Sequence, residues 1–291
     1  MDETTTHGLS RDLIVPYLKP LSPVETGLQF KGELKPPIRC LLCDIYGTLL
    51  ISASGDVGRD QTNPSRNKHL AQLLSRHGIT RSVDEMIAAL HDAVKRDHAE
   101  AKERGVDYPE VRIDAIWQQL LPDKNRQQVL EFAIEYEMVS NPVWPMPHFL
   151  ELLSTCRKRR ILLGIISNAQ FFTPNIMAWL TETSLEKLGF RSDLTFYSYR
   201  YGVAKPSGRL FQMAAEQLKK EGIEPHQTAY MGNDMRKDIL PAKQQAFQTI
   251  LFAGDARSLR MDGESDEIEI SEPDLIVTQL NQVISSLQPD E

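Results

Sequence analysis

The stretch LLCDIYGTLL, residues 41–50, joins an apolar run to a single carboxylate, Asp44, and then to a Tyr-Gly-Thr turn. A short apolar run bounded by turn residues is typical of a fully buried β-strand. A buried charge is costly unless it is paired or coordinated. The stretch therefore predicts a buried strand that carries a functional carboxylate, Asp44, at its carboxyl end.

Strand and helix signals alternate along the chain after residue 142. Helical patterns cover 147–158, 173–188, 207–220, 236–245 and 278–287. Strand-like runs lie between them: RILLGIIS (160–167), LTFYSY (194–199), TAYMGND (228–234), QTILFAG (248–254) and DLIV (274–277). This alternation predicts an α/β fold, a doubly wound parallel sheet of Rossmann-like type with helices on both faces.

The segment from about residue 64 to 140 carries helical signals only. Ser82 and Glu85 form a capping-box pattern at the start of a helix over 82–105. Further helices are predicted over 109–121 and 124–139, with a short one around 70–74, which is enough for a small bundle. We therefore expect three parts: an N-terminal extension (1–35), an α/β core (36–60 and 142–291) and an inserted helical cap (61–141).

Composition narrows the class of partner. The 291 residues carry 33 Lys and Arg against 40 Asp and Glu, a formal net charge of −7. This balance disfavours nonspecific binding to nucleic acid or anionic membranes. No apolar run reaches the roughly 18 residues of a membrane helix, and the N-terminus has no signal-peptide core. We expect a cytoplasmic protein that acts on a small anionic molecule, with no nucleic-acid or membrane partner and an open oligomeric state.

Cysteine usage points to no metal or disulfide framework, since the chain has only three cysteines. Cys40 and Cys43 spell C-x-x-C, but no second cysteine pair completes a zinc site. Residues three apart on a strand point to opposite faces. We therefore expect both to be buried strand residues.

Polar side chains follow four of the predicted strands, near the carboxyl end of each. In an open parallel sheet, ligands bind beyond these ends. The residues expected to converge there are Asp44 after the first strand, Ser167 and Asn168 after the second, Lys205 after the third, and Asn233, Asp234 and Asp238 after the fourth.

This set has the chemistry of a hydrolase with a carboxylate nucleophile. A buried Asp44 can attack phosphorus or carbon and form a covalent intermediate. The Lys205 ammonium would keep Asp44 ionised and balance an anionic substrate. Two or three carboxylates with water would hold Mg²⁺. The metal would shield the repulsion between the nucleophile and a phosphate.

The order of these residues resembles the haloacid dehalogenase (HAD) superfamily, a large group of aspartate-nucleophile hydrolases, over about residues 38–255. DIYGTLL resembles its first motif, IISNA the second, AKPSGRLF the third and GNDMRKD the fourth, with a helical cap after the first. The resemblance implies that Asp44 is the nucleophile and that Ser167 lies at the substrate-anion position. It also implies that Lys205 neutralises nucleophile and substrate.

The phosphatase pattern of this superfamily implies a Mg²⁺ held by Asp44, by the backbone carbonyl of Tyr46 and by the fourth motif. Asp234 and Asp238 lie four residues apart, whereas counting from Asn233 gives five. The alignment is therefore ambiguous by one residue, and all three stay candidate metal ligands.

Tyr46 stands where phosphatases of this superfamily usually carry a second aspartate, which protonates the leaving group and later activates water. A phenol, with an ordinary pKa of about 10, is a poor general acid or base near neutral pH. The Asp-x-Tyr-Gly-Thr form instead resembles the first motif of the 2-haloacid dehalogenases, which expel halide without a proton donor or a metal. Tyr46 would then pack in the site floor or shape the substrate pocket.

Three functions follow from this mixture. The one we favour is Mg²⁺-dependent hydrolysis of a small phosphorylated metabolite through an aspartyl-phosphate intermediate. The second is metal-independent hydrolysis of a carbon–halogen bond. The third is a catalytically weak protein that binds a ligand or partner. The intact set Asp44, Ser167, Lys205 and Asp234 argues against the third function, and Tyr46 argues for it.

Other side chains have weaker assignments. Thr48 hydrogen-bonds within the first motif or contacts substrate, and Asn168 contacts substrate or caps the following turn. His91 and His98 share a helix face, and we expect that face to be solvated rather than to bind a metal. An Arg of DARSLR, 255–260, could reach a substrate anion, although a surface loop is the commoner role for such a segment.

Overall fold

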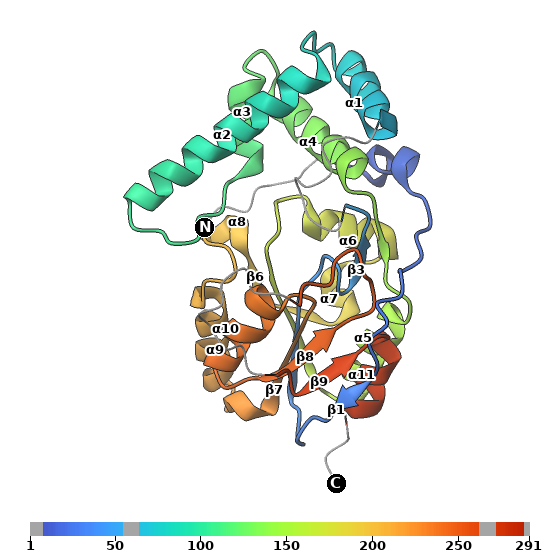
Figure 1. Ribbon diagram of the computed structural model, residues 1–291, viewed down its shortest axis with the longest axis vertical. Coiled ribbons are helices and arrows are strands. Elements are labelled where there is room, and N and C mark those ends of the chain that lie inside the picture. Colours follow the sequence, from blue (N-terminus) through green and yellow to red (C-terminus); the bar gives the residue numbers. More distant parts are fainter. Residues whose placement is uncertain (1–7, 55–63, 262–271, 288–291) are drawn as a thin grey trace.

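The computed structural model describes residues 8–54, 64–261 and 272–287 and shows an α/β core below a helical cap (Figure 1). The strands of the core sheet are β1 (Lys31–Gly32), β2 (Cys40–Cys43), β5 (Leu162–Ser167), β6 (Phe190–Tyr197), β7 (Thr228–Gly232), β8 (Gln248–Phe252) and β9 (Leu275–Val277). Their order is β1-β9-β8-β7-β2-β5-β6. Every neighbouring pair is parallel except β1 with β9.

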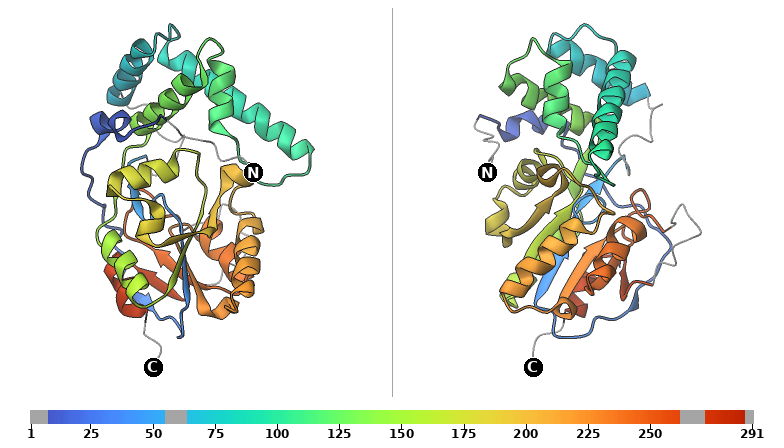
Figure 2. Two further views of the ribbon diagram at one scale, coloured as in Figure 1. Left: turned by 180° about the vertical axis from the view of Figure 1, so that it is seen from behind. Right: turned by 90° about the vertical axis from the view of Figure 1, so that its left-hand side faces the viewer.

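Helices cover both faces of this sheet, as Figure 2 shows. Cys43 of β2 packs in the cluster that holds α5 (Phe149–Lys158) and α11 (Leu280–Ser286), whereas Cys40 packs with α9 (Arg209–Lys220). The two cysteines are buried and free on opposite faces, as predicted. The remaining core helices are α6 (Thr173–Thr181), α7 (Leu185–Leu188), α8 (Ser198–Tyr201) and α10 (Leu240–Gln244). The predicted doubly wound fold is confirmed.

Four helices form the cap: α1 (Pro64–Arg76), α2 (Val83–Glu103), α3 (Ile113–Leu120) and α4 (Arg126–Ser140). The predicted capping box of Ser82 and Glu85 is present at the start of α2. Trp117 of α3 packs edge-on against Phe132 of α4, with ring centroids 4.9 Å apart. No described helix is long and apolar enough to cross a membrane.

A short antiparallel pair, β3 (Leu50–Ser52) and β4 (Val143–Pro145), joins the cap to the core. Ser52 Oγ donates to Asn141 Oδ1 at 2.8 Å, and this hydrogen bond links the two segments that connect the core to the cap. The predicted boundary at 60/61 lies outside the described residues, and the one at 141/142 falls just before β4.

The cap also rests directly on the core through the loop after α2. The Glu110 amide donates to the Gly202 carbonyl at 3.2 Å, and the Ala204 amide donates to the Tyr108 carbonyl at 2.8 Å. These contacts and the β3–β4 pair hold the cap over the carboxyl end of the sheet.

Two predicted helices are interrupted. The helix over 173–188 splits into α6 and α7, because Glu182 adopts a left-handed conformation with φ of 54°. The helix over 236–245 begins as a π-helical turn, η4 (Met235–Ile239), before α10. Such turns are rare and concentrate at functional sites. This one has Asp234 at its N-cap and Asp238 within it.

Residues 8–35 run along the outside of the molecule from the cap to the edge of the sheet (Figure 1). Their first part forms the 3-10 turns η1 (Arg11–Leu13) and η2 (Val15–Tyr17). The Tyr17 hydroxyl donates to the Glu135 carboxylate of α4 at 2.8 Å. Further along, β1 pairs with β9. The predicted N-terminal extension therefore contacts both cap and core.

Candidate active site

The turn after β2 places Asp44 at the carboxyl end of the sheet. The Asp44 amide donates to the Met231 carbonyl of β7 at 2.9 Å. Gly47 then adopts φ of 80°, and a Cβ at this position would lie 2.4 Å from the Ser258 side chain. Only glycine satisfies both the left-handed conformation and this close approach, which explains the glycine of the Asp-x-Tyr-Gly-Thr pattern.

Lys205, Asp44 and Asp238 form a buried ion-pair network. Lys205 Nζ lies 2.8 Å from Asp44 Oδ1 and 2.5 Å from Asp238 Oδ1, and it donates to the Tyr230 hydroxyl at 3.0 Å. Asp44 is 6% exposed, Lys205 4% and Asp238 1%. The structure therefore brings together residues that the sequence separates by up to 194 positions, from Asp44 to Asp238.

Burial and mutual charge set the protonation of this network. Burial raises the pKa of Asp44, the Lys205 ammonium opposes that rise, and Asp238 adds to it. Burial by itself would lower the pKa of Lys205, but Asp238 and Asp44 raise it to about 12. Lys205 is therefore cationic at neutral pH and favours an ionised Asp44, the form that a nucleophile needs.

The predicted substrate-binding residues take different positions. Ser167 is fully buried at the end of β5, and its hydroxyl has no hydrogen-bond partner within the described ranges, although its proximity lowers the pKa of Asp44. Asn168 accepts from the Lys205 amide at 2.7 Å and donates to the Lys205 carbonyl at 3.1 Å. Thr48 donates to Asn233 Oδ1 at 3.0 Å. Asn168 and Thr48 thus hold other site residues in place, and the substrate contacts predicted for them stay predictions.

Asp238, one of the predicted metal ligands, is surrounded by protein donors. Its Oδ1 accepts from Lys205 and from the Tyr230 hydroxyl, and its Oδ2 accepts from the amides of Asn233 and Asp234 at 3.0 Å each. A Cβ at Gly232 would lie 2.3 Å from Asp238 Cγ, so glycine makes room for this side chain. Asp238 therefore acts as the anionic anchor of Lys205 in this arrangement.

The remaining predicted metal ligands differ in whether they keep an oxygen atom without a hydrogen-bond partner. Asn233 is engaged at both ends of its amide. Asp44 contacts Lys205 through Oδ1 only, and Asp234 uses Oδ1 for two amides of the π-helical turn. None of the described backbone amides donates to the Tyr46 carbonyl. Asp44, Asp234 and this carbonyl are therefore the donors most open to a cation.

These donors suit a hard cation although they form no recognisable side-chain cluster. Among the described residues, no three His, Cys, Asp or Glu side chains are arranged to hold a metal ion. Two carboxylates and one carbonyl with water match the incomplete oxygen set that Mg²⁺ commonly takes from a protein. Burial and the Asp238 charge raise the pKa of Asp234, so a cation there would relieve electrostatic repulsion.

Tyr46 shapes the pocket floor. Its hydroxyl lies 2.9 Å from Thr173 Oγ1, and its ring packs against the main hydrophobic cluster. Burial raises the pKa of the phenol far above its ordinary value, and the charge of Glu137 adds to the effect. Tyr46 therefore stays protonated and is a weaker proton donor than an ordinary phenol.

These residues border a pocket of about 880 Å³ between cap and core. Asp44, Tyr46, Lys205, Asp234 and Asp238 line it from the core, together with Asn168 and Asn233, while Ser167 and Thr48 are buried behind the lining.

The cap side of the pocket contains His91 and His98 of α2. His91 is exposed and His98 is half-buried, so the predicted solvated face also borders the pocket. Within DARSLR, Arg260 also lines the pocket, whereas Arg257 binds Asp255 at 2.8 Å.

Two carboxylates that line this pocket, Glu110 and Glu137, lie outside the four sequence motifs. Glu110 accepts from Ser198 at 2.7 Å and from Gln170 at 3.1 Å, and burial raises its pKa. Burial raises the pKa of Glu137 to about 7, although the residue keeps part of its surface open to the pocket. In the sequence, Glu137 is marked only by its place near the end of the helix predicted over 124–139.

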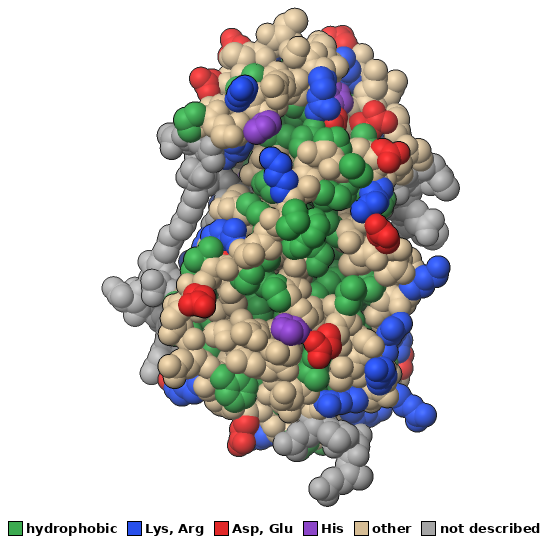
Figure 3. Space-filling model, turned by 90° about the vertical axis from the view of Figure 1, so that its right-hand side faces the viewer, with side chains coloured by type: hydrophobic (Ala, Val, Ile, Leu, Met, Phe, Trp, Pro, Cys, Tyr) green, Lys and Arg blue, Asp and Glu red, His purple; other side chains and the backbone are tan. Residues whose placement is uncertain are grey.

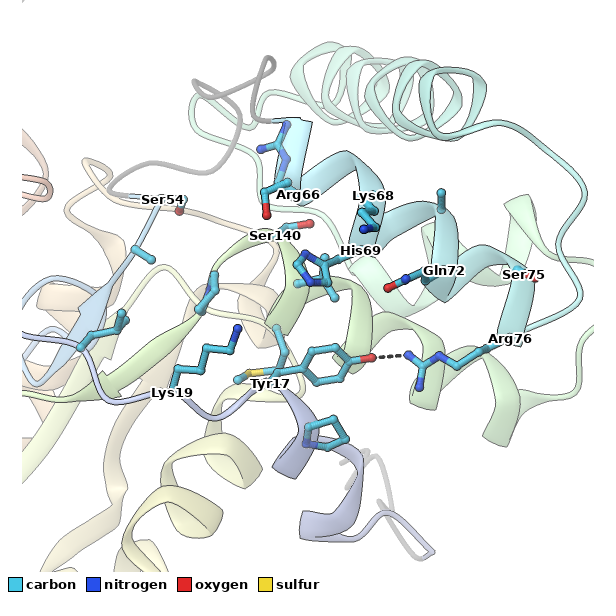
Figure 4. A pocket seen from close by; sticks show the side chains of 18 residues that line it. Tyr17, Lys19, Ser54, Arg66, Lys68, His69, Gln72, Ser75, Arg76 and Ser140 are labelled. Atoms are coloured by element: carbon cyan, nitrogen blue, oxygen red, sulfur yellow. Dashed lines mark hydrogen bonds between the residues drawn. The ribbon is translucent and has the colours of Figure 1, made fainter.

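A second and larger pocket, of about 1090 Å³, lies between the N-terminal segment and α1 (Figure 4). Figure 3 shows this side of the molecule, where hydrophobic side chains gather in the middle and basic and acidic side chains lie around them. The charged residues that line it are Lys19, Arg66, Lys68 and Arg76. It contains none of the predicted catalytic residues, so we place the reaction in the smaller pocket.

Comparison with known proteins agrees with this site. The family model of haloacid dehalogenase-like hydrolases matches residues 38–245, well over half of the chain. The chain belongs to this family. The predicted membership, the fold class and the assignment as a hydrolase are therefore confirmed.

Solved structures of similar fold include two dehalogenases. The 2-haloacid dehalogenase of Pseudomonas syringae pv. Tomato DC3000 has a TM-score of 0.54 and 17% identity, covering 86% of this chain and 98% of its own. The L-2-haloacid dehalogenase of Xanthobacter autotrophicus with chloropropionic acid covalently bound has a TM-score of 0.51 and 16% identity, with the same coverage. At these identities the likeness concerns the fold alone.

A relative by sequence is a phosphatase. The glyceraldehyde 3-phosphate phosphatase of Methanocaldococcus jannaschii is 28% identical over 125 residues, which cover 42% of this chain and 50% of the relative. The match thus spans half the length of that protein. Phosphatases and dehalogenases both occur among the proteins that this HAD-like hydrolase resembles.

Proposed function

We propose that this protein is a Mg²⁺-dependent phosphohydrolase of a small phosphorylated metabolite. The observation that carries the proposal is the surplus of buried acid on the pocket floor. Asp44 and Asp238 bind one ammonium, Lys205, and the half-buried Asp234 adds the charge of a third acid beside Asp238. Expulsion of halide from carbon would need no such surplus, whereas a divalent cation beside a phosphate would balance it.

Asp44 would attack the phosphorus atom through the oxygen that Lys205 does not bind. The new O–P bond forms an aspartyl-phosphate while the bond from phosphorus to the leaving oxygen breaks. Water then attacks this intermediate, releases inorganic phosphate and restores the Asp44 carboxylate. A bound Mg²⁺, held by Asp44, Asp234 and the Tyr46 carbonyl, would supply charge neutralisation for the phosphate oxygens.

Ser167 fits the substrate-anion position that its place in the second motif implies. Its hydroxyl is buried beside Asp44 and has no hydrogen-bond partner in the part of the chain that the structure describes. An unpaired buried hydroxyl costs roughly 1–3 kcal/mol, and a phosphate oxygen would satisfy it. Asn168 supports the same step indirectly, because it fixes the backbone of Lys205.

The proton for the leaving oxygen has to come from a group other than the usual second aspartate. Tyr46 is unsuited because burial raises the pKa of its phenol. Glu137 lines the same pocket, and its pKa of about 7 lets it hold a proton near neutral pH. We assign Glu137 as the candidate proton donor, with water as the alternative source.

Dehalogenation is the second candidate, favoured by one feature. Tyr46 in the Asp-x-Tyr-Gly-Thr pattern matches the first motif of 2-haloacid dehalogenases, and Asp44 could equally attack carbon. The Asp234 oxygen that the π-helical turn leaves open has no role in that reaction. A binding protein without catalysis would require no intact network around Lys205.

Phosphate release from an activated aryl phosphate, with Mg²⁺ and with chelator, tests the proposal. We expect turnover by the native protein only with Mg²⁺, its loss in Asp44→Asn, and a weaker response to Mg²⁺ in Asp234→Asn. Release that survives chelation or Asp44→Asn would contradict the mechanism. No release under any condition, together with halide release from a 2-haloacid, would establish the second candidate instead.

A further inference from the structure

One face of the cap helix α2 lines the catalytic pocket and is rich in cations. The spacing of its pocket residues follows the helical repeat, so a single face is directed toward the site. These residues are Leu90, His91, Val94, Lys95, His98, Ala99 and Lys102. Four of the seven are basic, and none is acidic.

The cationic groups of this face are not used by the protein itself. Neither the Lys95 nor the Lys102 side chain forms a hydrogen bond or ion pair with a described residue. His98 Nε2 is buried without a hydrogen-bond partner among those residues. A buried polar atom without a partner is uncommon in native proteins and calls for an explanation such as a ligand or a water molecule.

The core adds further cations at the pocket, Lys237 and Arg260. Arg260 donates to the carbonyls of Arg257 and Leu259, which fixes the position of its guanidinium. Basic groups thus line the pocket from both cap and core.

The acids of the pocket, by contrast, are largely committed elsewhere. Asp44 and Asp238 bind Lys205, and Glu110 binds Ser198, Gln170 and a backbone amide. The basic face of α2 is therefore not neutralised by the carboxylates on the floor. A volume of about 880 Å³ also exceeds what a phosphate alone would fill.

We infer that the substrate carries a second anionic group, a carboxylate or a second phosphate, which Lys95 and Lys102 of α2 bind while the first phosphate lies at Asp44. This inference rests on the proposed function and names its substrate class. It makes Lys95 and Lys102 specificity-determining residues and gives His98 Nε2 a polar partner.

Matched pairs of aryl phosphates test this inference. The first pair is 4-carboxyphenyl and 4-carbamoylphenyl phosphate, which differ in the charge of one substituent. The second pair, 4-(2-carboxyethyl)phenyl phosphate and its amide, carries the charge further out and insulates it from the leaving oxygen. Hydrolysis is followed as kcat and KM, and binding is measured by calorimetry on the Asp44→Asn protein.

We expect the acid of at least one pair to be preferred over its amide roughly three- to tenfold, mainly in KM. In the double variant Lys95→Gln/Lys102→Gln the ratio should fall to about one. Lys68→Gln is the matched control, because Lys68 lies on the cap but lines the other pocket. Its ratio should match the native one.

The outcomes separate the two proposals. Hydrolysis of all four probes without preference for the acids, in turnover and in binding, would overturn the inference and leave the phosphatase standing. Absence of hydrolysis together with preferential binding of the acids would overturn the phosphatase and retain the anion site. An equal loss of preference in Lys68→Gln would also contradict the assignment to α2.

Discussion

The catalytic pocket has a floor, formed by the core residues around Asp44, and a cap wall, formed by the pocket face of α2. The two differ in whether their charged side chains have partners within the protein. On the floor, Lys205 has three donors and finds Asp44, Asp238 and Tyr230 within 3.0 Å. On the cap wall, Lys95 and Lys102 are exposed and make no ion pair with a described residue.

This difference separates two tasks. A network that is satisfied and buried is rigid, which suits groups that must keep their geometry during a reaction. Solvated side chains on a cap can adapt to different ligands at little cost, which suits selection of a substrate. Changes on the floor should therefore affect stability and turnover together, whereas changes on the wall should affect recognition.

The largest effect should come from Lys205→Met. It leaves Asp44 and Asp238 buried without their cation, which should cost about 3–5 kcal/mol of unfolding free energy. Turnover should fall by roughly 10²–10³-fold, because the positive charge beside the nucleophile is lost. Urea denaturation and phosphate release measure the two effects.

The matched control is Lys243→Met. Lys243 also pairs with an aspartate, Asp274, but at 3.5 Å and with both side chains partly exposed. We expect a change below about 1 kcal/mol and unchanged turnover. If Lys205→Met is no more destabilising than this control, the description of the floor as a tightly coupled network is wrong.

A smaller effect, in the opposite direction, should come from Tyr46→Asp. An aspartate restores the acid that phosphatases of this family usually carry here, so hydrolysis of a substrate with a poor leaving group should rise about tenfold. The lost ring contacts should cost roughly 2–4 kcal/mol of stability. Initial rates with an alkyl phosphate provide the measurement.

Tyr46→Phe is the companion variant, since it keeps the ring and removes only the hydroxyl that bonds Thr173. We expect its turnover to stay within about threefold of native. A loss of 10²-fold or more in Tyr46→Phe would show that the phenol itself transfers the proton.

The core of the fold could be predicted from the sequence because its signals are local. The apolar run that ends at Asp44 has a strand pattern of its own, which does not depend on distant parts of the chain. Parallel strands then bring their carboxyl ends to one edge of the sheet. The order of the strands and the contact between N-terminal segment and sheet depend on long-range packing, which no local pattern carries.

The site was predictable in part for the same reason. Motifs identified Asp44 and Lys205, but the one-residue ambiguity at Asn233 and Asp234 has a physical source. The chain there forms a π-helical turn, in which the Ile239 amide bonds to the Asp234 carbonyl five residues back. Spacing rules for an α-helix do not apply to such a turn.

The cap wall was missed because a polar helix face looks the same in sequence whether water or a ligand pocket covers it. His91 and His98 lie on such a face, in a helix with mixed charge. Only the position of α2 over the sheet distinguishes the two cases.

Glu137 of α4 also lines the catalytic pocket, and Glu137→Gln should show the smallest effect on stability, one that depends on pH. In the folded protein burial raises the pKa of Glu137 to about 7, against an ordinary value of 4.5. Between these values the folded state keeps a proton that the unfolded chain has released. The free energy of unfolding should therefore fall as pH rises through this window.

Glutamine removes this titration, so the variant should lose less stability than the native protein between pH 5 and pH 8. We expect a difference of about 1–3 kcal/mol, reduced by the water that reaches the open side of the residue. Urea denaturation at both pH values measures it, with Glu131→Gln on the same helix as control. Equal pH dependence in native and Glu137→Gln proteins would show that the carboxylate is not held in its neutral form. The assignment of Glu137 as proton donor would then lose its physical basis, since a carboxylate that is ionised at neutral pH has no proton to give.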